Sequence, residues 1–180
     1  DGTIFDVAET RANVEAFQPP WAGRGARASP QVRLVSLVES GTHVLFGPAI
    51  GSSRDGETTL AHRVVPALGP GMLCPADRSF FGGAPWAASR ATGAALVWRI
   101  KRPARLPCER GLPDGSYLST TCRSDRDRRH QTSGTRVRVI DYRLSGVRDA
   151  DPLHRLVTTL LDPAAAPAEE LAAIYHERGE

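Results

Sequence analysis

The stretch AALVWRI, residues 94–100, indicates the fold class. Such a short and almost continuously apolar run is typical of a strand buried in the centre of an α/β sheet. Upstream of it, residues 80–91 predict a helix and residues 72–74 a short apolar strand. Strands and helices therefore alternate in this region, and the sequence predicts an α/β fold.

The N-terminal part predicts further strands. Residues 1–8 read as a strand, and a long polar loop rich in Pro and Gly follows them. Residues 32–38 and 42–50 are rich in β-branched and aliphatic residues and flank a Ser-Gly turn, so we expect them to pair as an antiparallel hairpin. Residues 57–68 have helical apolar spacing, and the Gly-Pro-Gly segment 69–71 ends that helix.

The C-terminal part changes character twice. From residue 103 to 144 the pattern is one of short β segments with turn residues and a charged stretch, which we interpret as a β-rich insertion. Residues 154–161 predict a core strand, and Asp162-Pro163 breaks it. A helix begins near Pro167 with acidic residues in its first turn, where they suit the helix dipole, and it is still running at Glu180.

Composition bounds the function only loosely. A chain of 180 residues with 41% hydrophobic and 24% charged residues is typical of one globular domain. The net charge of +3 permits an acidic partner such as DNA without requiring one. No apolar run approaches the length that spans a bilayer, and no leader opens the chain, so a cytoplasmic protein without a membrane partner is expected. The spacing of the three cysteines supports neither a disulfide framework nor a zinc knuckle.

Two acidic residues are candidates for chemistry. Asp1 and Asp77 each accompany an apolar strand and are followed by small or aromatic residues. Carboxylates at adjacent strand ends can hold a divalent ion, and oxygen ligands suit Mg²⁺ or Mn²⁺. The alternative is that each Asp is a helix cap or turn former, the commoner use of a strand-end Asp. The five histidines show no pair at ligand spacing on one predicted element, and no GxxxxGK loop is present.

The C-terminal segment favours the catalytic interpretation. LHRLVTTLLDP (residues 153–163) followed by EELAAIYHER (residues 169–178) closely resembles the end of the catalytic domain in bacterial insertion-sequence transposases of the DDE type, IS-four group. In that family, Asp1-Gly2-Thr3 corresponds to the first catalytic Asp motif and residues 76–81, ADRSFF, to the second, usually written ADRGF. Ser79 stands where the family usually has Gly. The resemblance extends over essentially the whole chain.

The resemblance implies a ribonuclease-H-like mixed sheet with flanking helices. Residues 1–102 would be the first part of its core, residues 103–144 the β-rich insertion, and residues 145–180 the last core strand and the start of a truncated catalytic helix. In the family the strand that delivers the first catalytic Asp is central. Because the chain holds that strand only from Asp1 onward, we expect a marginally stable or aggregation-prone product.

The family signature also implies the roles of two residues in the last helix. Tyr175 and Arg178 match a pattern of Tyr, two residues, Arg, three residues and Glu, and they would contact DNA. Read without the family, the same residues fit an amphipathic helix whose Tyr packs and whose Arg is solvated. The catalytic Glu would fall two residues beyond Glu180, so this chain is expected to lack it and to be inactive alone.

The implied chemistry is metal-dependent DNA strand cleavage and transfer in transposition. Asp1 and Asp77 would be catalytic residues that bind Mg²⁺ or Mn²⁺. The implied partners are the terminal inverted repeats, target DNA and a second copy of the chain in a synaptic homodimer, with the protein on the nucleoid when bound to DNA. Two alternatives are an inactive transposase remnant that retains at most DNA binding, and a ribonuclease-H-like nuclease unrelated to transposition.

Other residues leave their interpretation open. A set of arginines in the insertion could follow phosphates or could form a solvated loop: Arg123, Arg126, Arg128, Arg129, Arg136 and Arg138. Trp86 and Trp98 lie in apolar runs and are predicted to be core, while Trp21 is the tryptophan to test for DNA contact. The abundance of Arg over Lys fits GC-rich codon usage as readily as phosphate binding.

Overall fold

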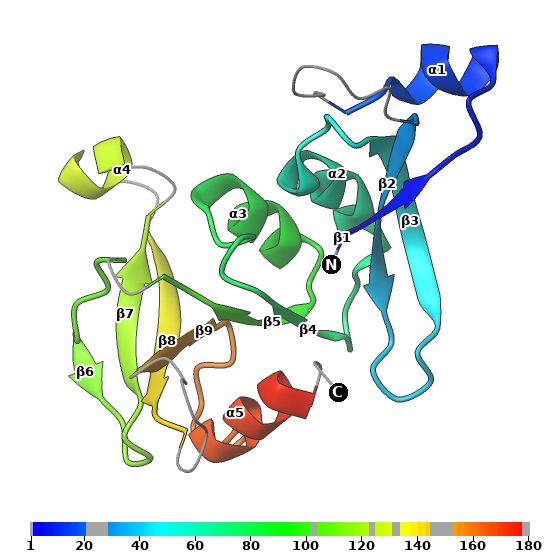
Figure 1. Cartoon of the computed structure of the whole chain (residues 1–180). Coiled ribbons are helices and arrows are strands. Elements are labelled where there is room, and N and C mark those ends of the chain that lie inside the picture. Colours follow the sequence, from blue (N-terminus) through cyan, green and yellow to red (C-terminus); the bar gives the residue numbers. More distant parts are fainter. Residues whose placement is uncertain are drawn as a thin grey trace. The chain divides into compact units, whose positions relative to one another are not determined.

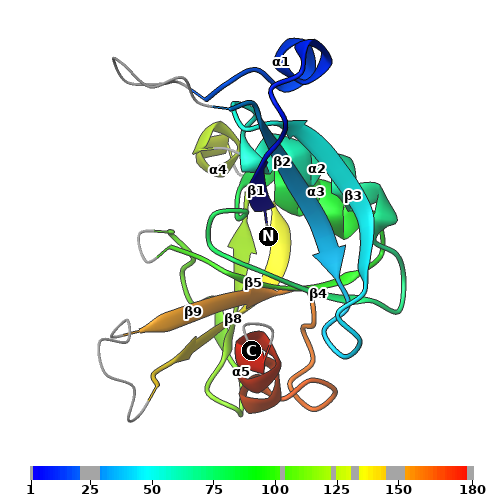
Figure 2. The ribbon, with the colours of Figure 1, turned by 45° about the vertical axis from the view of Figure 1, so that its right-hand side comes forward.

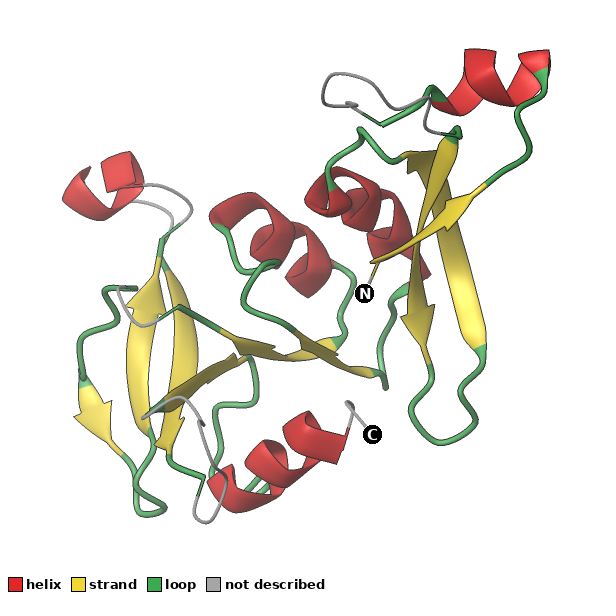
Figure 3. Ribbon diagram, in the orientation of Figure 1, coloured by secondary structure: helices red, strands yellow, loops and turns green. Residues whose placement is uncertain are grey.

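The computed structural model describes residues 2–20, 29–101, 104–122, 125–130, 134–144 and 153–177. These residues fall into two compact units, Asp1–Ala67 and Leu68–Glu180. Figure 3 shows that each unit combines a sheet with helices, which agrees with the predicted α/β class. No helix within the described ranges is long and apolar enough to cross a bilayer.

The first unit is built on an antiparallel sheet with the strand order β1-β2-β3 (Figure 1). Its strands are β1 (Gly2–Asp6), β2 (Gln31–Val38) and β3 (Leu45–Ser52). The predicted hairpin is confirmed as β2 and β3, with a shift of register between Val35 and Leu37. In the described residues β1 pairs with β2 alone, so it is an edge strand and does not have the central position that was expected.

Helix α2 (Glu57–Val64) covers one face of this sheet. It continues into a 3-10 turn, Val65–Ala67, so the predicted helix over residues 57–68 is confirmed. Leu60 and Val64 pack against Val35 and Ala49 and form the core of the unit. Gly47, with φ +57°, permits this approach, since a Cβ there would lie 2.5 Å from the Ala67 Cβ.

Helix α1 (Arg11–Phe17) occupies a segment that the sequence predicted as loop. The Thr10 hydroxyl accepts a hydrogen bond from Asn13 N at 3.2 Å and caps the helix start. Arg11 and Glu15 form an exposed pair one turn apart. The prediction was wrong because the Pro and Gly residues that follow this short helix dominated the pattern.

The second unit contains a mixed sheet with the strand order β4-β5-β9-β8-β7-β6. Its strands are β4 (Leu73–Ala76), β5 (Ala95–Arg99), β6 (Arg110–Gly111), β7 (Tyr117–Thr121), β8 (Thr135–Tyr142) and β9 (His154–Thr158). β4 and β5 are parallel, and the other neighbours are antiparallel. The β segments of residues 103–144 therefore extend the sheet that contains β5, because β8 pairs with β9.

Helices cover both faces of this sheet. α3 (Gly83–Ala91) lies on one face and α5 (Ala168–Glu177) on the other, as Figures 1 and 2 show. The alternation of side chains along β5 divides the core accordingly, since Leu96 and Trp98 join the α3 cluster and Val97 joins the α5 cluster. The short helix α4 (Asp125–His130) lies in the charged stretch of the predicted insertion.

Candidate functional site

Asp77 lies directly after β4, at the carboxyl end of a parallel strand. A turn begins there, in which Phe80 N donates to the Asp77 carbonyl oxygen at 3.1 Å. The Arg78 amide donates to Asp77 Oδ1 and orients the carboxylate. The side chain is only partly buried. Asp77 is thus both the turn former that its sequence context allowed and an accessible carboxylate that could bind a cation.

Aromatic side chains support the turn that carries Asp77. Phe80 and Phe81 pack against the α3 cluster. The Phe81 ring meets the Trp86 ring edge-on with centroids 5.6 Å apart, and Trp86 meets Trp98 in the same way at 5.2 Å. Both tryptophans are 3% exposed, so their predicted core positions are confirmed. The Asp77 turn is therefore attached to a buried aromatic part of the core.

Tyr175 lies on α5 and is buried, with 3% of its surface exposed. Together with Leu171 it packs against Val97, Ile140 and Leu156 from three strands. Its ring therefore has the packing role that an amphipathic helix predicts, and a DNA contact through this residue stays a prediction. Arg178, its partner in the signature, lies outside the described residues.

The start of α5 is held by an ion pair between a buried arginine and a partly exposed aspartate. Arg138 of β8 is fully buried, and its Nη2 donates to Asp114 Oδ2 in the turn before β7. Arg138 Nε donates to Ser116 Oγ at 2.7 Å, and Nη1 donates to the Ala166 carbonyl oxygen at 2.6 Å. Asp114 Oδ2 also accepts from Ala168 N at 3.0 Å, the first residue of α5. Both interpretations of Arg138, a phosphate contact and a residue of a solvated loop, are therefore wrong, because Arg138 lies in a strand and its guanidinium is enclosed by protein acceptors.

These hydrogen bonds also set the ionisation of Asp114. Burial by itself would raise its pKa. The hydrogen bonds from the hydroxyl and amide of Ser116 and from the Ala168 amide, together with the charge of Arg138, outweigh burial and hold the pKa of Asp114 below its ordinary value. The carboxylate therefore stays ionised beside the buried guanidinium.

A cluster of three rings near the end of α5 was missed by the sequence reasoning. His176 and the β9 residue His154 have ring centroids 5.6 Å apart. Tyr142 of β8 stacks on His154 at 5.3 Å, and its hydroxyl shares a hydrogen bond with His176 Nε2 at 2.9 Å. No local spacing could reveal the cluster, because its members come from two strands and a helix.

The structure does not bring the predicted site residues together within its described ranges. Asp1, Arg178, Trp21 and Arg123 lie outside them, and the side chains of Arg126 and Arg128 are not described. Arg129 and Arg136 are exposed, which a phosphate contact requires, but they lie on α4 and β8 and not in the loop that was the alternative. Among the described residues, no three His, Cys, Asp or Glu side chains form a group that could hold a metal. Of the two predicted metal ligands, Asp77 is the one that lies within the described residues.

Comparison with known proteins gives a distant relative. No family model matches the chain. The chain is 24% identical over 182 aligned positions, which cover all of it, to "Transposase InsG for insertion sequence element IS4" of Escherichia coli (strain K12). This similarity supports a distant transposase relationship. The chain spans 41% of the length of that relative.

Proposed function

We propose that the chain is part of the catalytic domain of a DDE-type transposase of the IS-four group, with a ribonuclease-H-like core. The observation that carries the proposal is the match of the whole chain to a transposase. Two local features support it: Asp77 is accessible at the carboxyl end of β4, and the Tyr of the signature lies on α5, with the Arg of the signature next in the sequence after the last residue of α5. DNA would be the partner, and terminal inverted repeats the specific sites.

In this proposal Asp77 and Asp1 are metal ligands. A divalent ion, Mg²⁺ or Mn²⁺, would supply positive charge for the oxygens that attack and leave in phosphodiester cleavage. Asp77 contributes one carboxylate, oriented by the Arg78 amide and supported by the aromatic core. Arg178 would donate paired hydrogen bonds to a DNA phosphate.

The third carboxylate of the signature would follow Glu180 by two residues. A polypeptide of these 180 residues therefore carries at most two of the three proposed ligands, and we expect it to bind DNA without cleaving it. A longer chain with a Glu at the position two residues beyond Glu180 should cleave if the transposase is active and should not cleave if it is an inactive remnant. The active transposase and the inactive remnant thus differ in whether they cleave DNA.

The experiment measures DNA affinity of the 180-residue chain with and without Mn²⁺. We expect Mn²⁺ to raise the affinity for a DNA duplex, and Asp77→Asn to weaken Mn²⁺ binding by at least about tenfold, because even outer-shell substitutions cost that much. Asp162→Asn is the matched control, since Asp162 is an exposed carboxylate whose Oδ1 caps a turn at Ala164 N.

Two results would contradict the proposal. Equal Mn²⁺ affinity in Asp77→Asn and Asp162→Asn would remove Asp77 from the metal site. Absence of DNA binding at low salt would remove the transposase function itself. Specific nicking of a terminal-repeat duplex by the 180-residue chain, lost in Asp77→Asn, would instead overturn the requirement for a third carboxylate beyond Glu180.

A further inference from the structure

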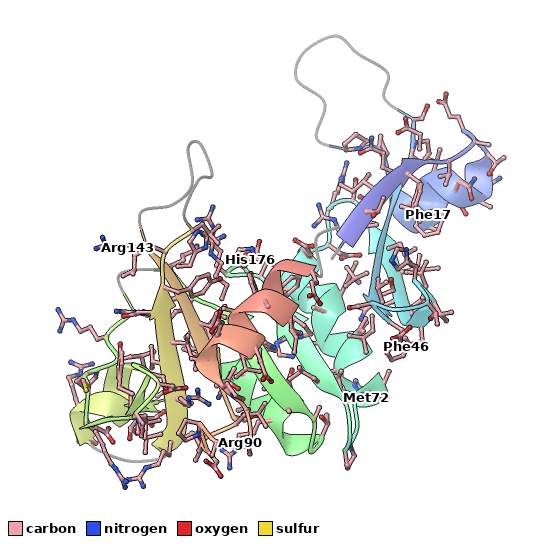
Figure 4. The ribbon with its side chains drawn as sticks, turned by 90° about the horizontal axis from the view of Figure 1, so that it is seen from below. Phe17, Phe46, Met72, Arg90, Arg143 and His176 are labelled. Carbon is pink, nitrogen blue, oxygen red and sulfur yellow. The ribbon has the colours of Figure 1, made fainter. Side chains whose placement is uncertain are left out.

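Strand β8 contacts α5 at both ends and in the middle. Arg138, Ile140 and Tyr142 alternate with Val137 and Val139 and so lie on one face of β8, the face that α5 covers. Arg138 bonds to Ala166 O just before the helix, and Tyr142 bonds to His176 near its end. Ile140 packs in the cluster that contains Tyr175. Figure 4 labels His176 on α5, whose ribbon lies beside these strands.

The lengths of the two elements match. From Arg138 to Tyr142 is four strand residues, which span about 13 Å at roughly 3.3 Å per residue. The polar contacts to β8 are made by the Ala166 carbonyl oxygen, two residues before α5 begins, and by His176. The eight helix residues from Ala168 to His176 span about 12 Å at 1.5 Å per residue. These two polar contacts add directional constraints on the position of α5 along the sheet to the apolar packing of Leu171 and Tyr175 on the strands.

The chemistry of the contact at the helix start also indicates a positioning role. The Arg138 side chain is fully buried, whereas that of Asp114 is 22% exposed. An ion pair that buries a charge often contributes no more to stability than apolar residues of the same size would. Arg138 nevertheless donates in three directions, to Asp114, Ser116 and the Ala166 carbonyl oxygen. Because the guanidinium is planar and rigid, these donors require each acceptor to lie in a defined direction. Asp114 in turn accepts from the first amide of α5. The start of the helix is thereby fixed to within hydrogen-bond distances.

We propose that Arg138 and Tyr142, with Asp114, are positioning residues that hold the signature helix in register for its contact with DNA. This inference rests on the proposed function, since it assigns a purpose to the placement of the helix that carries Tyr175 and directly precedes Arg178 in the sequence. In this proposal β8 and the turn that carries Asp114 position α5, in addition to any DNA contact that the exposed arginines of residues 103–144 make.

The first arm of the test measures hydrogen exchange of α5 amides in the 180-residue chain. Arg138→Met should lower the protection of the first turn of α5 by about tenfold or more, because it removes charge-assisted hydrogen bonds. Tyr142→Phe, which keeps the fold in place, should lower protection near His176 by a smaller factor. The β7–β8 amides should keep their protection in Tyr142→Phe.

Matched controls make the same chemical changes away from α5. Arg155→Met removes an arginine that pairs with Asp141 within the sheet, and Tyr117→Phe removes a hydroxyl that faces Leu106 O. Neither control should change exchange in α5 selectively. Unchanged α5 protection in Tyr142→Phe, or an equal loss of protection throughout the second unit, would overturn the positioning role.

The second arm measures the salt dependence of binding to a mixed-sequence DNA duplex. Arg178→Ala should reduce the salt slope by about one, the value for one phosphate contact. If β8 positions Arg178, Tyr142→Phe should weaken binding, and the double variant Tyr142→Phe/Arg178→Ala should be no weaker than Arg178→Ala. A purely structural role would make the two losses multiply and would overturn the proposal.

The two arms separate the two hypotheses. If Arg178→Ala leaves the salt slope unchanged, Arg178 does not contact a DNA phosphate, and the proposal that β8 positions Arg178 for DNA binding fails. The exchange arm still decides whether β8 anchors α5. If the slope falls but α5 exchange is unaffected by Tyr142→Phe, the proposed function stands and the positioning inference fails.

Discussion

Helices α2 and α5 each cover a sheet face, but they are held differently. α2 buries Leu60 and Val64 against Val35 and Ala49, and no side chain caps its start at Gly56. α5 also has an apolar cluster, but in addition its start is bonded to Asp114, the ion-pair partner of the buried Arg138, and its end to Tyr142. Apolar contacts fix which face of a helix is buried. Directional polar contacts fix its position along the axis, which a functional site needs.

The largest effect on the free energy of unfolding is expected from a substitution in the apolar core between α2 and its sheet. Leu60→Ala should lower the free energy of unfolding of the first unit by about 2–5 kcal/mol, since Leu60 is fully buried. Urea unfolding combined with hydrogen exchange in β2 and β3 measures it. Ile50→Ala is the control, because Ile50 lies in the same sheet with 56% of its surface exposed. Similar losses for the two variants would show that α2 does not hold this core.

A smaller effect on the free energy of unfolding is expected at the polar contacts that hold the start of α5, and this effect depends on pH. Asp114→Asn should cost about 1.5–3 kcal/mol at neutral pH, because a charge-assisted partner of Arg138 is lost. The folded pKa of Asp114 lies below its ordinary value of 3.8, so the carboxylate contributes fully above that value and loses its contribution as the pH falls through the folded pKa.

Urea unfolding of the wild type and Asp114→Asn at neutral and acid pH checks the sign. The difference between them should be constant above about pH 5 and should shrink below pH 4. A difference that stays the same at acid pH would show that the ionised carboxylate is not what anchors α5.

The smallest effect is expected at an exposed polar contact between α2 and β1. Glu57 Oε1 accepts from Gly2 N at 2.7 Å, but this contact is exposed. Glu57→Gln should therefore change the free energy of unfolding by less than about 1 kcal/mol. Glu169→Gln in the first turn of α5 is the matched control. A larger loss in Glu57→Gln would mean that α2 is also positioned by a polar contact and would weaken the comparison.

Apolar patterns predicted most of the elements correctly. The β2–β3 hairpin, α2, β5 and the buried tryptophans follow from runs and periodicities that local sequence contains. α1 was missed because a helix of two turns gives little periodic signal beside a Pro-rich segment. Its capping Thr10 was the one available sign.

The errors about the site have a different cause. Residues 137–142, VRVIDY, alternate in a way that places Arg138 on a solvent face if only one face of the sheet is covered. α5 covers the second face, so the arginine is buried. The pairing of His154 with His176 likewise depends on contact between β9 and α5. Asp77 could be predicted, because its place after a strand depends on neighbouring residues alone.

The matched lengths of β8 and α5 restrict which insertions and deletions the protein can tolerate. One residue added between Arg138 and Tyr142 would turn one of them to the opposite face of the strand. One residue added between Ala168 and His176 would rotate the helix end by about 100°, since 3.6 residues make a turn. Engineered tags or natural length changes should therefore be accepted outside these two intervals far more readily than within them.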